Sequence, residues 1–416
     1  RQLALAHSCA KSTISDDQMG LVCSTPQPNE ASSHLNENFG EGTGEAMQKL
    51  AELLGRVDKA VNGGSNMTHP YLVNLGLIVK QVEQERRYPK PITSGSKFTD
   101  IGVMKRATRY AAFASAAYCS GKRAIAEYIG SFDPDDIKFV REDTTGQSTF
   151  PSFFVADDPE MDEIVLCIRG VRSAGDALQE TVCSKEPFMG GKVHSGLLEK
   201  AKFVVRTVQD EMVRISRDSP RKGIAVVGHS VGAGIAILAT ILLCGDGSPF
   251  ARFMAARKVK CFAFASPPTF EPLWALPPWV HASTYSFVHN MDCVPRACLG
   301  TLSKLLLAVK EVDSLSLTGL QRMLYLRGDY ELPQTLPDYV EIPDSLQDVL
   351  ASLHGIGTIV ILYRGSDGVI QCENCTPAMT DRLLMHPEMA VDHLMPSYER
   401  AIDDAYTLLR SQKICC

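Results

Sequence analysis

The chain has 416 residues, of which 45% are hydrophobic and 22% are charged, and its formal net charge at pH 7 is -6. This composition is ordinary for a globular protein with a large buried core. It argues against a general nucleic-acid-binding protein, because neutralising phosphate groups requires a surplus of Lys and Arg. We therefore expect no nucleic-acid partner.

The thirteen cysteines are scattered along the chain and are odd in number. Three of them lie inside apolar runs, where a thiol behaves as a small hydrophobic group: Cys167, Cys244 and Cys261. This pattern does not suggest a disulfide framework, so we expect a reducing, cytosol-facing environment. Cys372 and Cys375 have the spacing of zinc ligands, but no second ligand pair stands near them, and we expect no metal site.

The N-terminal part of the chain differs in pattern from the rest. Residues 1–45 are rich in small polar and charged residues without a sustained period, which predicts a disordered or loosely attached leader. A helical or irregular extension is expected over 46–97. The chain begins with Arg1 rather than Met, so the sequence leaves open transmembrane segments upstream, and Cys415 and Cys416 would be candidates for lipidation if they end the native chain.

From residue 98 onward, apolar runs alternate between helical and strand-like patterns. We expect strands at 153–156, 163–168, 224–227, 260–265, 284–289 and 358–363, and helices at 101–118, 196–216, 231–243 and 396–410. Strands that alternate with helices and are apolar throughout predict a mostly parallel sheet with helices on both faces. The sequence therefore predicts an α/β domain over 98–412.

A short motif inside this domain indicates a nucleophilic serine. Gly228-His229-Ser230-Val231-Gly232 fits the G-x-S-x-G pattern, which occurs by chance in long chains, but here an apolar strand enters it directly and a small-residue helix leaves it directly. We expect Gly228 and Gly232 to leave room across a sharp, strained turn. Ser230 would then lie at a helix N-terminus, where free N–H groups favour a developing oxyanion.

A serine nucleophile needs a histidine as base and an acid that orients this histidine, and in α/β-hydrolases the acid precedes the histidine in the chain. Three histidines follow a suitable acid: His354, His386 and His393. We favour His393, on a loop directly before the terminal helix, with His386 as the alternative. Asp292 follows a predicted strand and is the expected acid, while Asp392 is a weaker candidate because adjacent side chains rarely face each other.

At these residues the sequence resembles the class 3 lipases and, within them, the diacylglycerol lipases. The resemblance rests on separated pieces from about residue 101 to the terminal helix: Ile168-Arg169-Gly170 with Asp176, Val193-His194-Ser195-Gly196, Val227 to Gly234, Phe264-Ala265-Ser266-Pro267-Pro268, Asp292-Cys293-Val294-Pro295-Arg296, and Asp392-His393 with Tyr398. It implies an α/β-hydrolase fold, a triad of Ser230, Asp292 and His393, and hydrolysis of glycerolipid esters. From diacylglycerol, such an enzyme would release a fatty acid and a monoacylglycerol.

The resemblance also implies an oxyanion hole formed by the backbone N–H groups of Val171 and Val231. The family usually has Ser or Thr after the Arg-Gly pair, whereas Val171 can offer only its N–H. Losing one oxyanion donor costs about 3 to 4 kcal/mol in other enzymes, so the hole is the weaker half of the predicted site. No cofactor is expected, and only the resemblance would admit calcium.

About 60 residues separate Arg296 from the next predicted strand, more than a compact α/β connection needs. Leucines in this insertion, residues 297–356, recur at helical spacing with Lys and Arg interleaved. Two interpretations are open: a helical insertion packed on the core, or a lid or membrane-docking element that brings an apolar substrate from a bilayer to the site.

The sequence thus predicts a lipase whose partners are a lipid substrate and a membrane surface, and it indicates no protein partner. The same triad would also serve a phospholipase A1, a galactolipase or a soluble carboxylesterase. A further alternative is a catalytically weak, lipase-like signalling scaffold, which the valine at position 171 would favour.

Overall fold

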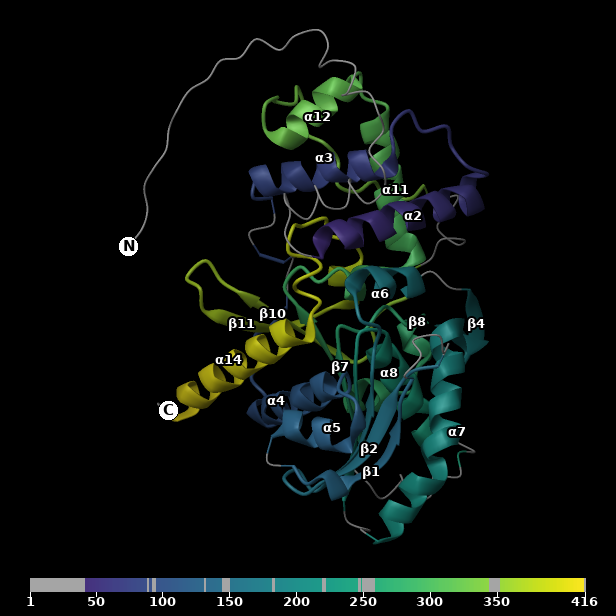
Figure 1. The fold of residues 1–416 in the computed structure, drawn as a ribbon, viewed down its shortest axis with the longest axis vertical. Helices are drawn as coiled ribbons and strands as arrows, with labels where there is room; N and C mark the ends of the chain where they lie inside the picture. Colours follow the sequence, from purple (N-terminus) through teal and green to yellow (C-terminus); the bar gives the residue numbers. More distant parts are fainter. Residues whose placement is uncertain are drawn as a thin grey trace.

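One eight-stranded sheet organises the molecule (Figure 1). In the computed structural model, residues 42–416 are described except for 88–89, 92–94, 131, 144–149, 182–183, 219–221, 246–247, 249–258, 344–351 and 415–416. The strands of the sheet, in spatial order, are β1 (Ile137–Arg141), β2 (Phe153–Asp158), β3 (Glu163–Ile168), β6 (Gly223–His229), β7 (Val259–Phe264), β9 (Thr284–His289), β10 (Thr358–Arg364) and β11 (Ile370–Cys375).

The middle of this sheet is parallel and its edges are antiparallel. The strands β3, β6, β7, β9 and β10 pair in parallel, whereas β1, β2 and β11 add antiparallel pairs at the two sides. Every residue of β3 is buried, as expected for a strand that has helices over both faces. The predicted α/β fold with a mostly parallel sheet is therefore confirmed.

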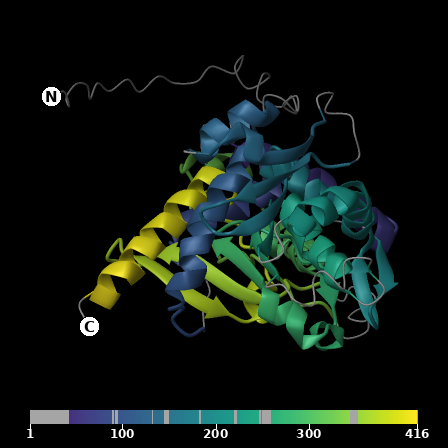
Figure 2. The same ribbon diagram turned by 90° about the horizontal axis from the view of Figure 1, so that it is seen from below.

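Alternate residues of each strand face two separate hydrophobic cores. Ile164, Leu166 and Ile168 of β3 pack with the helices α7 (Ser195–Asp218) and α8 (Val231–Cys244). Val165 and Cys167 pack on the opposite face, in a core built with three helices: α4 (Ile101–Ala116), α5 (Gly121–Ile129) and α14 (Met395–Ile414). Figure 2 shows α14 and α4 side by side on one side of the sheet and α7 on the other.

Smaller elements complete the domain. A second sheet joins β4 (Lys185–Phe188), β5 (Gly191–His194) and β8 (Phe270–Glu271), and α6 (Ala174–Thr181) and α10 (Pro278–Ser283) are short helices. None of these was predicted, and neither were the edge strands β1 and β11. All the described cysteines are free thiols. Of the helices in the described ranges, none is both long and apolar enough to cross a bilayer.

The N-terminal extension and the insertion form one helical layer at the end of the molecule next to α6 (Figure 1). It contains α2 (Thr43–Asn62), α3 (Tyr71–Gln84), α11 (Leu299–Asp313) and α12 (Gly319–Arg327). The apolar residues of α11 are buried in the same core as those of α2, which agrees with a packed insertion. Helix α2 begins three residues inside the predicted leader, while residues 1–41 and the terminal Cys415 and Cys416 lie outside the described residues.

A buried polar cluster fastens the two parts of this layer together. The carboxylate of Asp313, at the end of α11, accepts the backbone N–H groups of Thr68 at 2.7 Å and His69 at 2.9 Å. It also accepts the amide of Asn74 at 3.1 Å, and Arg322 of α12 donates to the amide oxygen of Asn74 at 2.7 Å. Because Asn74 and Arg322 are fully buried and need polar partners, the cluster fixes the insertion against the extension.

Replacing Asp313 by Ala tests this attachment. The substitution leaves the buried amide of Asn74 and the half-buried N–H of His69 without their acceptor, so we expect the free energy of unfolding to fall by about 2 kcal/mol in urea denaturation. Asp329→Ala, at an exposed aspartate just after α12, is the matched control and should leave stability near that of the parent. Equal stabilities of the two variants would show that the cluster does not hold the layer.

Candidate active site

The turn between β6 and α8 places Ser230 in an uncommon backbone conformation. Its φ is 59° and its ψ is -132°, and it stands between the last residue of β6 and the first residue of α8. Such a conformation costs a non-glycine residue of the order of 1–3 kcal/mol and persists only where the surroundings enforce it. The N–H of Ser230 donates to the carbonyl of Phe264, on the neighbouring strand β7, at 2.8 Å, which helps to hold the turn.

Three glycines make room for this turn. A Cβ at Gly228 would stand 2.3 Å from the carbonyl oxygen of Gly232, across the turn, as the sequence suggested. A Cβ at Gly232 would instead meet the carbonyl oxygen of Ile168 on β3 at 2.4 Å. At Gly170 it would approach the Cβ of Ser230 to 2.8 Å. Both the turn itself and the neighbouring strand β3 therefore exclude side chains from these three positions.

The three residues expected to form the triad lie in one hydrogen-bonded row. Nε2 of His393 is 2.9 Å from Oγ of Ser230, and Nδ1 of His393 is 3.0 Å and 3.1 Å from the two carboxylate oxygens of Asp292. Asp292 follows β9 and His393 precedes α14, so both side chains come from loops beside the elbow. All three are buried, and Ser230 and Asp292 have no exposed surface.

Asp292 is kept ionised although it is buried. Burial alone would raise the pKa of its carboxyl, but His393 beside it and the hydrogen bonds that it accepts outweigh burial and lower this pKa. The donors include the hydroxyl of Tyr398 at 2.7 Å and the N–H of Val294 at 2.9 Å. With its pKa lowered in this way, Asp292 is ionised at neutral pH and can hold the imidazole of His393 in one tautomer and stabilise its cation.

A buried arginine, Arg296, holds the backbone of the loop that carries Asp292. Arg296 has no exposed surface, and its guanidinium donates to the carbonyl oxygens of Asp292 at 2.6 Å and Asn290 at 3.1 Å. Arg296 belongs to the motif at Asp292, but the motif alone does not indicate this role. Arg296 binds backbone oxygens of this loop and no side chain of the triad. Such a contact depends on the path of the folded loop, so no sequence pattern indicates it.

The alternative candidates lie elsewhere. The carboxylate of Asp392 faces away from His393 and accepts from the amide of Asn290 at 2.8 Å and the N–H of Met291 at 3.0 Å. Burial first, and then the charges of Glu388 and Asp292, raise the pKa of Asp392 to about 7. His386 accepts the N–H of Glu388 through Nδ1 at 3.2 Å and makes no contact with Ser230.

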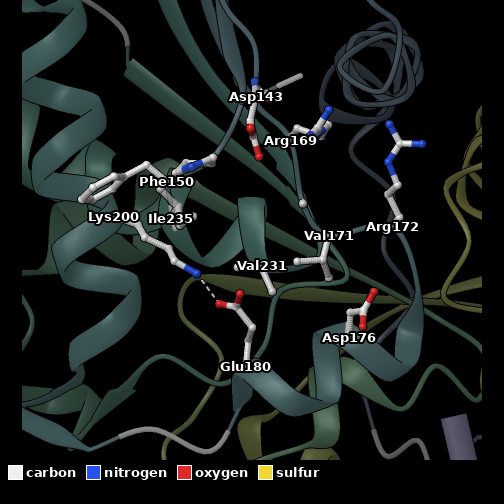
Figure 3. A pocket seen from close by; sticks show the side chains of 13 residues that line it. Asp143, Phe150, Arg169, Val171, Arg172, Asp176, Glu180, Lys200, Val231 and Ile235 are labelled. Carbon is white, nitrogen blue, oxygen red and sulfur yellow. Dashed lines mark hydrogen bonds and ion pairs between the residues drawn. The ribbon is translucent and has the colours of Figure 1, made fainter. Parts of the chain in front are cut away.

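Val171 and Val231, the expected oxyanion residues, line a common cavity (Figure 3). Val171 follows Gly170, and Val231 is the first residue of α8, where an N–H has no acceptor within its helix. In the described part of the chain, no backbone carbonyl accepts the N–H of Val171. The cavity measures about 240 Å³, and its charged lining residues are Asp143, Arg169, Arg172, Asp176, Glu180 and Lys200.

Two further residues of the site were not recognised from the sequence. The hydroxyl of Tyr118 lies 2.8 Å from Nδ1 of His229, and Nε2 of His229 lies 2.9 Å from the backbone oxygen of His393. In the sequence, Tyr118 is the last residue of the helix predicted at 101–118 and His229 is a member of the pentapeptide, and neither pattern indicates a contact between them. No short pattern joins two residues so far apart, so their contact required the fold.

Residues 165–301 match the family model described as "Lipase (class 3)". Diacylglycerol lipase-alpha of Rattus norvegicus is 30% identical over 128 residues, which cover 28% of this chain and 11% of that protein. Secreted mono- and diacylglycerol lipase 1 of Fusarium solani is 27% identical over 150 residues, covering 34% of this chain and 45% of that protein. The chain thus spans less than half the length of either relative. A crystal structure of a lipase from Rhizopus microsporus var. chinensis has a TM-score of 0.48 at 18% identity, covering 74% of this chain and 92% of that one.

The sheet, the elbow and the hydrogen-bonded row define a serine hydrolase of the α/β-hydrolase fold. Residues 165–301, which carry Ser230 and Asp292, match the class 3 lipase model, and 28% of the chain is similar to a diacylglycerol lipase. The resemblance stated from the motifs is therefore confirmed.

The buried Asp392 gives the protein a pH dependence that can be measured. Its folded pKa of about 7 lies above its usual value of 3.8, so between these pH values the folded chain keeps a proton that the unfolded chain has lost. Stability from this group therefore falls by about 1.4 kcal/mol per pH unit as the pH rises through that window, and then levels off. Asp392→Asn cannot titrate, so its Tm should depend less on pH between 4 and 7. Asp329→Asn should keep the pH dependence of the parent, and an unchanged profile in Asp392→Asn would contradict the prediction.

Proposed function

We propose that this chain is a serine lipase that hydrolyses glycerolipid esters, most favourably diacylglycerol to a monoacylglycerol and a fatty acid, at a membrane surface. The observation that carries the proposal is the row from Ser230 through His393 to Asp292, in a segment of class 3 lipase sequence. Two of the similar proteins are named for action on diacylglycerol, and they are 30% and 27% identical to this chain over 128 and 150 residues. No metal or cofactor takes part in this proposal.

The geometry suits acyl transfer in two steps. His393 Nε2 takes the proton of the Ser230 hydroxyl as Oγ attacks the ester carbonyl, and Asp292 stabilises the resulting imidazolium. The negative charge on the carbonyl oxygen is then received by the N–H groups of Val171 and Val231. The intermediate expels the glyceride alcohol, which takes the proton from His393, and water activated by the same histidine releases the fatty acid from Ser230.

The cavity beside the proposed oxyanion hole favours the polar part of an ester. Charged side chains form much of its wall, and the Lys200–Glu180 ion pair crosses it (Figure 3). Burying hydrocarbon against such groups is unfavourable, whereas a glycerol hydroxyl can hydrogen-bond to them. Since Ser230 and His393 are buried, segments around the site must move before an ester reaches Oγ. A cytosol-facing, membrane-associated setting and a lipid surface as partner belong to the same proposal.

Labelling with a fluorophosphonate probe tests the nucleophile. The parent should label and Ser230→Ala should not, because the probe reacts with an activated serine. If neither protein labels, the scaffold alternative is favoured; if both label equally, Ser230 is not the nucleophile. A panel of diacylglycerol, phospholipid, galactolipid and short-chain esters then distinguishes a diacylglycerol lipase from a phospholipase A1, a galactolipase or a carboxylesterase.

Two histidine variants test the base. His393→Ala removes the general base and should lower kcat by about 10⁴-fold or more, whereas His386→Ala should keep kcat within about twofold of the parent. Rates of ester hydrolysis under saturating substrate measure both. A large loss in His386→Ala alone would reverse the assignment.

A threonine at position 171 tests the oxyanion hole. Val171→Thr has nearly the same shape and adds a hydroxyl donor, so kcat should rise by about tenfold or more while KM changes little. Val171→Ala keeps the N–H without adding a hydroxyl and should show no such gain. If the threonine variant is no faster than the alanine variant, position 171 does not face the developing charge.

A further inference from the structure

The phenol of Tyr118 lies where two functional loops meet. We call residues 169–172 the oxyanion loop and residues 391–394 the base loop. The hydroxyl of Tyr118 is 3.1 Å from the carbonyl oxygen of Val171 and 2.8 Å from Nδ1 of His229. The N–H of Gly170 faces the same hydroxyl, and a Cβ at Gly170 would approach it to 2.9 Å. Tyr118 therefore contacts the oxyanion loop directly.

His229 continues this contact to the base loop. Its Nε2 lies 2.9 Å from the carbonyl oxygen of His393, which can only accept, so Nε2 carries the hydrogen. Burial, followed by the charge of His393, lowers the pKa of His229 to about 3, so the ring is neutral and Nδ1 carries no hydrogen. Nδ1 of His229 and the carbonyl oxygen of Val171 are therefore both acceptors for the Tyr118 hydroxyl, which lies within hydrogen-bond distance of each. Tyr118 is thus the donor toward both loops.

The charged groups near Tyr118 and His229 do not change which atoms of these two rings donate and which accept. Arg169 and Arg172 lie on the side of Tyr118, and Asp292 and His393 lie on the side of His229. The rings of His229 and His393 are 4.9 Å apart between centroids, and those of Tyr118 and His229 are 5.9 Å apart. None of the charged groups intervenes in the hydrogen bonds of His229, whose two ring nitrogens are both occupied.

We propose that Tyr118 and His229 are positioning residues, which join the oxyanion loop to the backbone of His393 through one hydrogen-bonded chain. The inference rests on the proposed hydrolase activity, because it concerns how accurately the two halves of that site are placed. It has particular weight here, since Val171 has no hydroxyl and its contribution depends on where its N–H points. A displacement of about 1 Å at such a site can cost about 10²-fold in rate.

Tyr118→Phe is the main test, and Tyr110→Phe is its matched control. Tyr110 is a buried tyrosine of α4 whose hydroxyl donates to Glu163, far from Ser230. Both variants delete one hydrogen-bonded hydroxyl, so both should lose stability in thermal denaturation. Only Tyr118→Phe should also lower kcat and the rate of fluorophosphonate labelling, by about tenfold, with KM within about twofold of the parent. A similar kcat in the two variants would overturn the inference.

His229 variants provide a rescue experiment. His229→Leu removes the hydrogen bonds of His229 to both Tyr118 and His393, so it should lower kcat at least as much as Tyr118→Phe. The double variant should be no slower than His229→Leu alone. His229→Gln keeps an amide donor for the carbonyl of His393 and should recover part of the lost rate. If the fold-losses in kcat of the two single variants multiply in the double variant, the two residues act separately and the proposed hydrogen-bonded chain is rejected.

The parent protein separates this inference from the proposed function. An active parent with a fully active Tyr118→Phe variant rejects only the positioning role. A parent that neither labels nor hydrolyses any ester rejects the hydrolase and the positioning role with it. Should Tyr118→Phe fail to fold, the comparison of His229→Gln with His229→Leu decides the question.

Discussion

The sharp turn at Ser230 is the constraint on which the rest of the site depends. A serine with a φ of 59° is unfavourable by itself and persists because β6 is hydrogen-bonded between β3 and β7 while α8 is almost fully buried. The same packing explains why Gly170 and Gly232 have no side chain, since the turn occupies the space at Gly170 and β3 occupies the space at Gly232. The hydrophobic core thus supplies the energy that holds the nucleophile in position.

Around this turn, the charges of the site are balanced by buried donors rather than by solvent. Asp292 accepts from His393, Tyr398 and Val294, and Arg296 holds the backbone of the same loop. A buried carboxylate without these donors would take up a proton and could no longer orient the imidazole. Asp292 can therefore be fully buried and still ionised.

The elements with strong periodicity could be predicted from the sequence, and those defined by distant partners could not. β3 and β9 have the predicted bounds, and the elbow, Asp292 and His393 lie close together because residues at strand ends in a parallel sheet share one edge. The short strands β4, β5 and β8 have too few residues to show a period. Nothing local indicates that Asp313 binds residues 68–69, or that Tyr118 meets His229, since each contact joins segments that only the fold brings together.

The helical layer also sets an order of events during folding. Its first two helices, α2 and α3, are synthesised before the sheet, but α11 and α12, which cover their apolar faces, follow only after β9. Until then, Leu50, Leu54 and Val79 lack partners that the finished protein gives them, while β3, β6 and β7 can already pair with one another. Contacts of such long sequence separation form late and leave apolar surface open to aggregation on the way. The three strands around the Ser230 turn are thus synthesised before the last two helices of the layer.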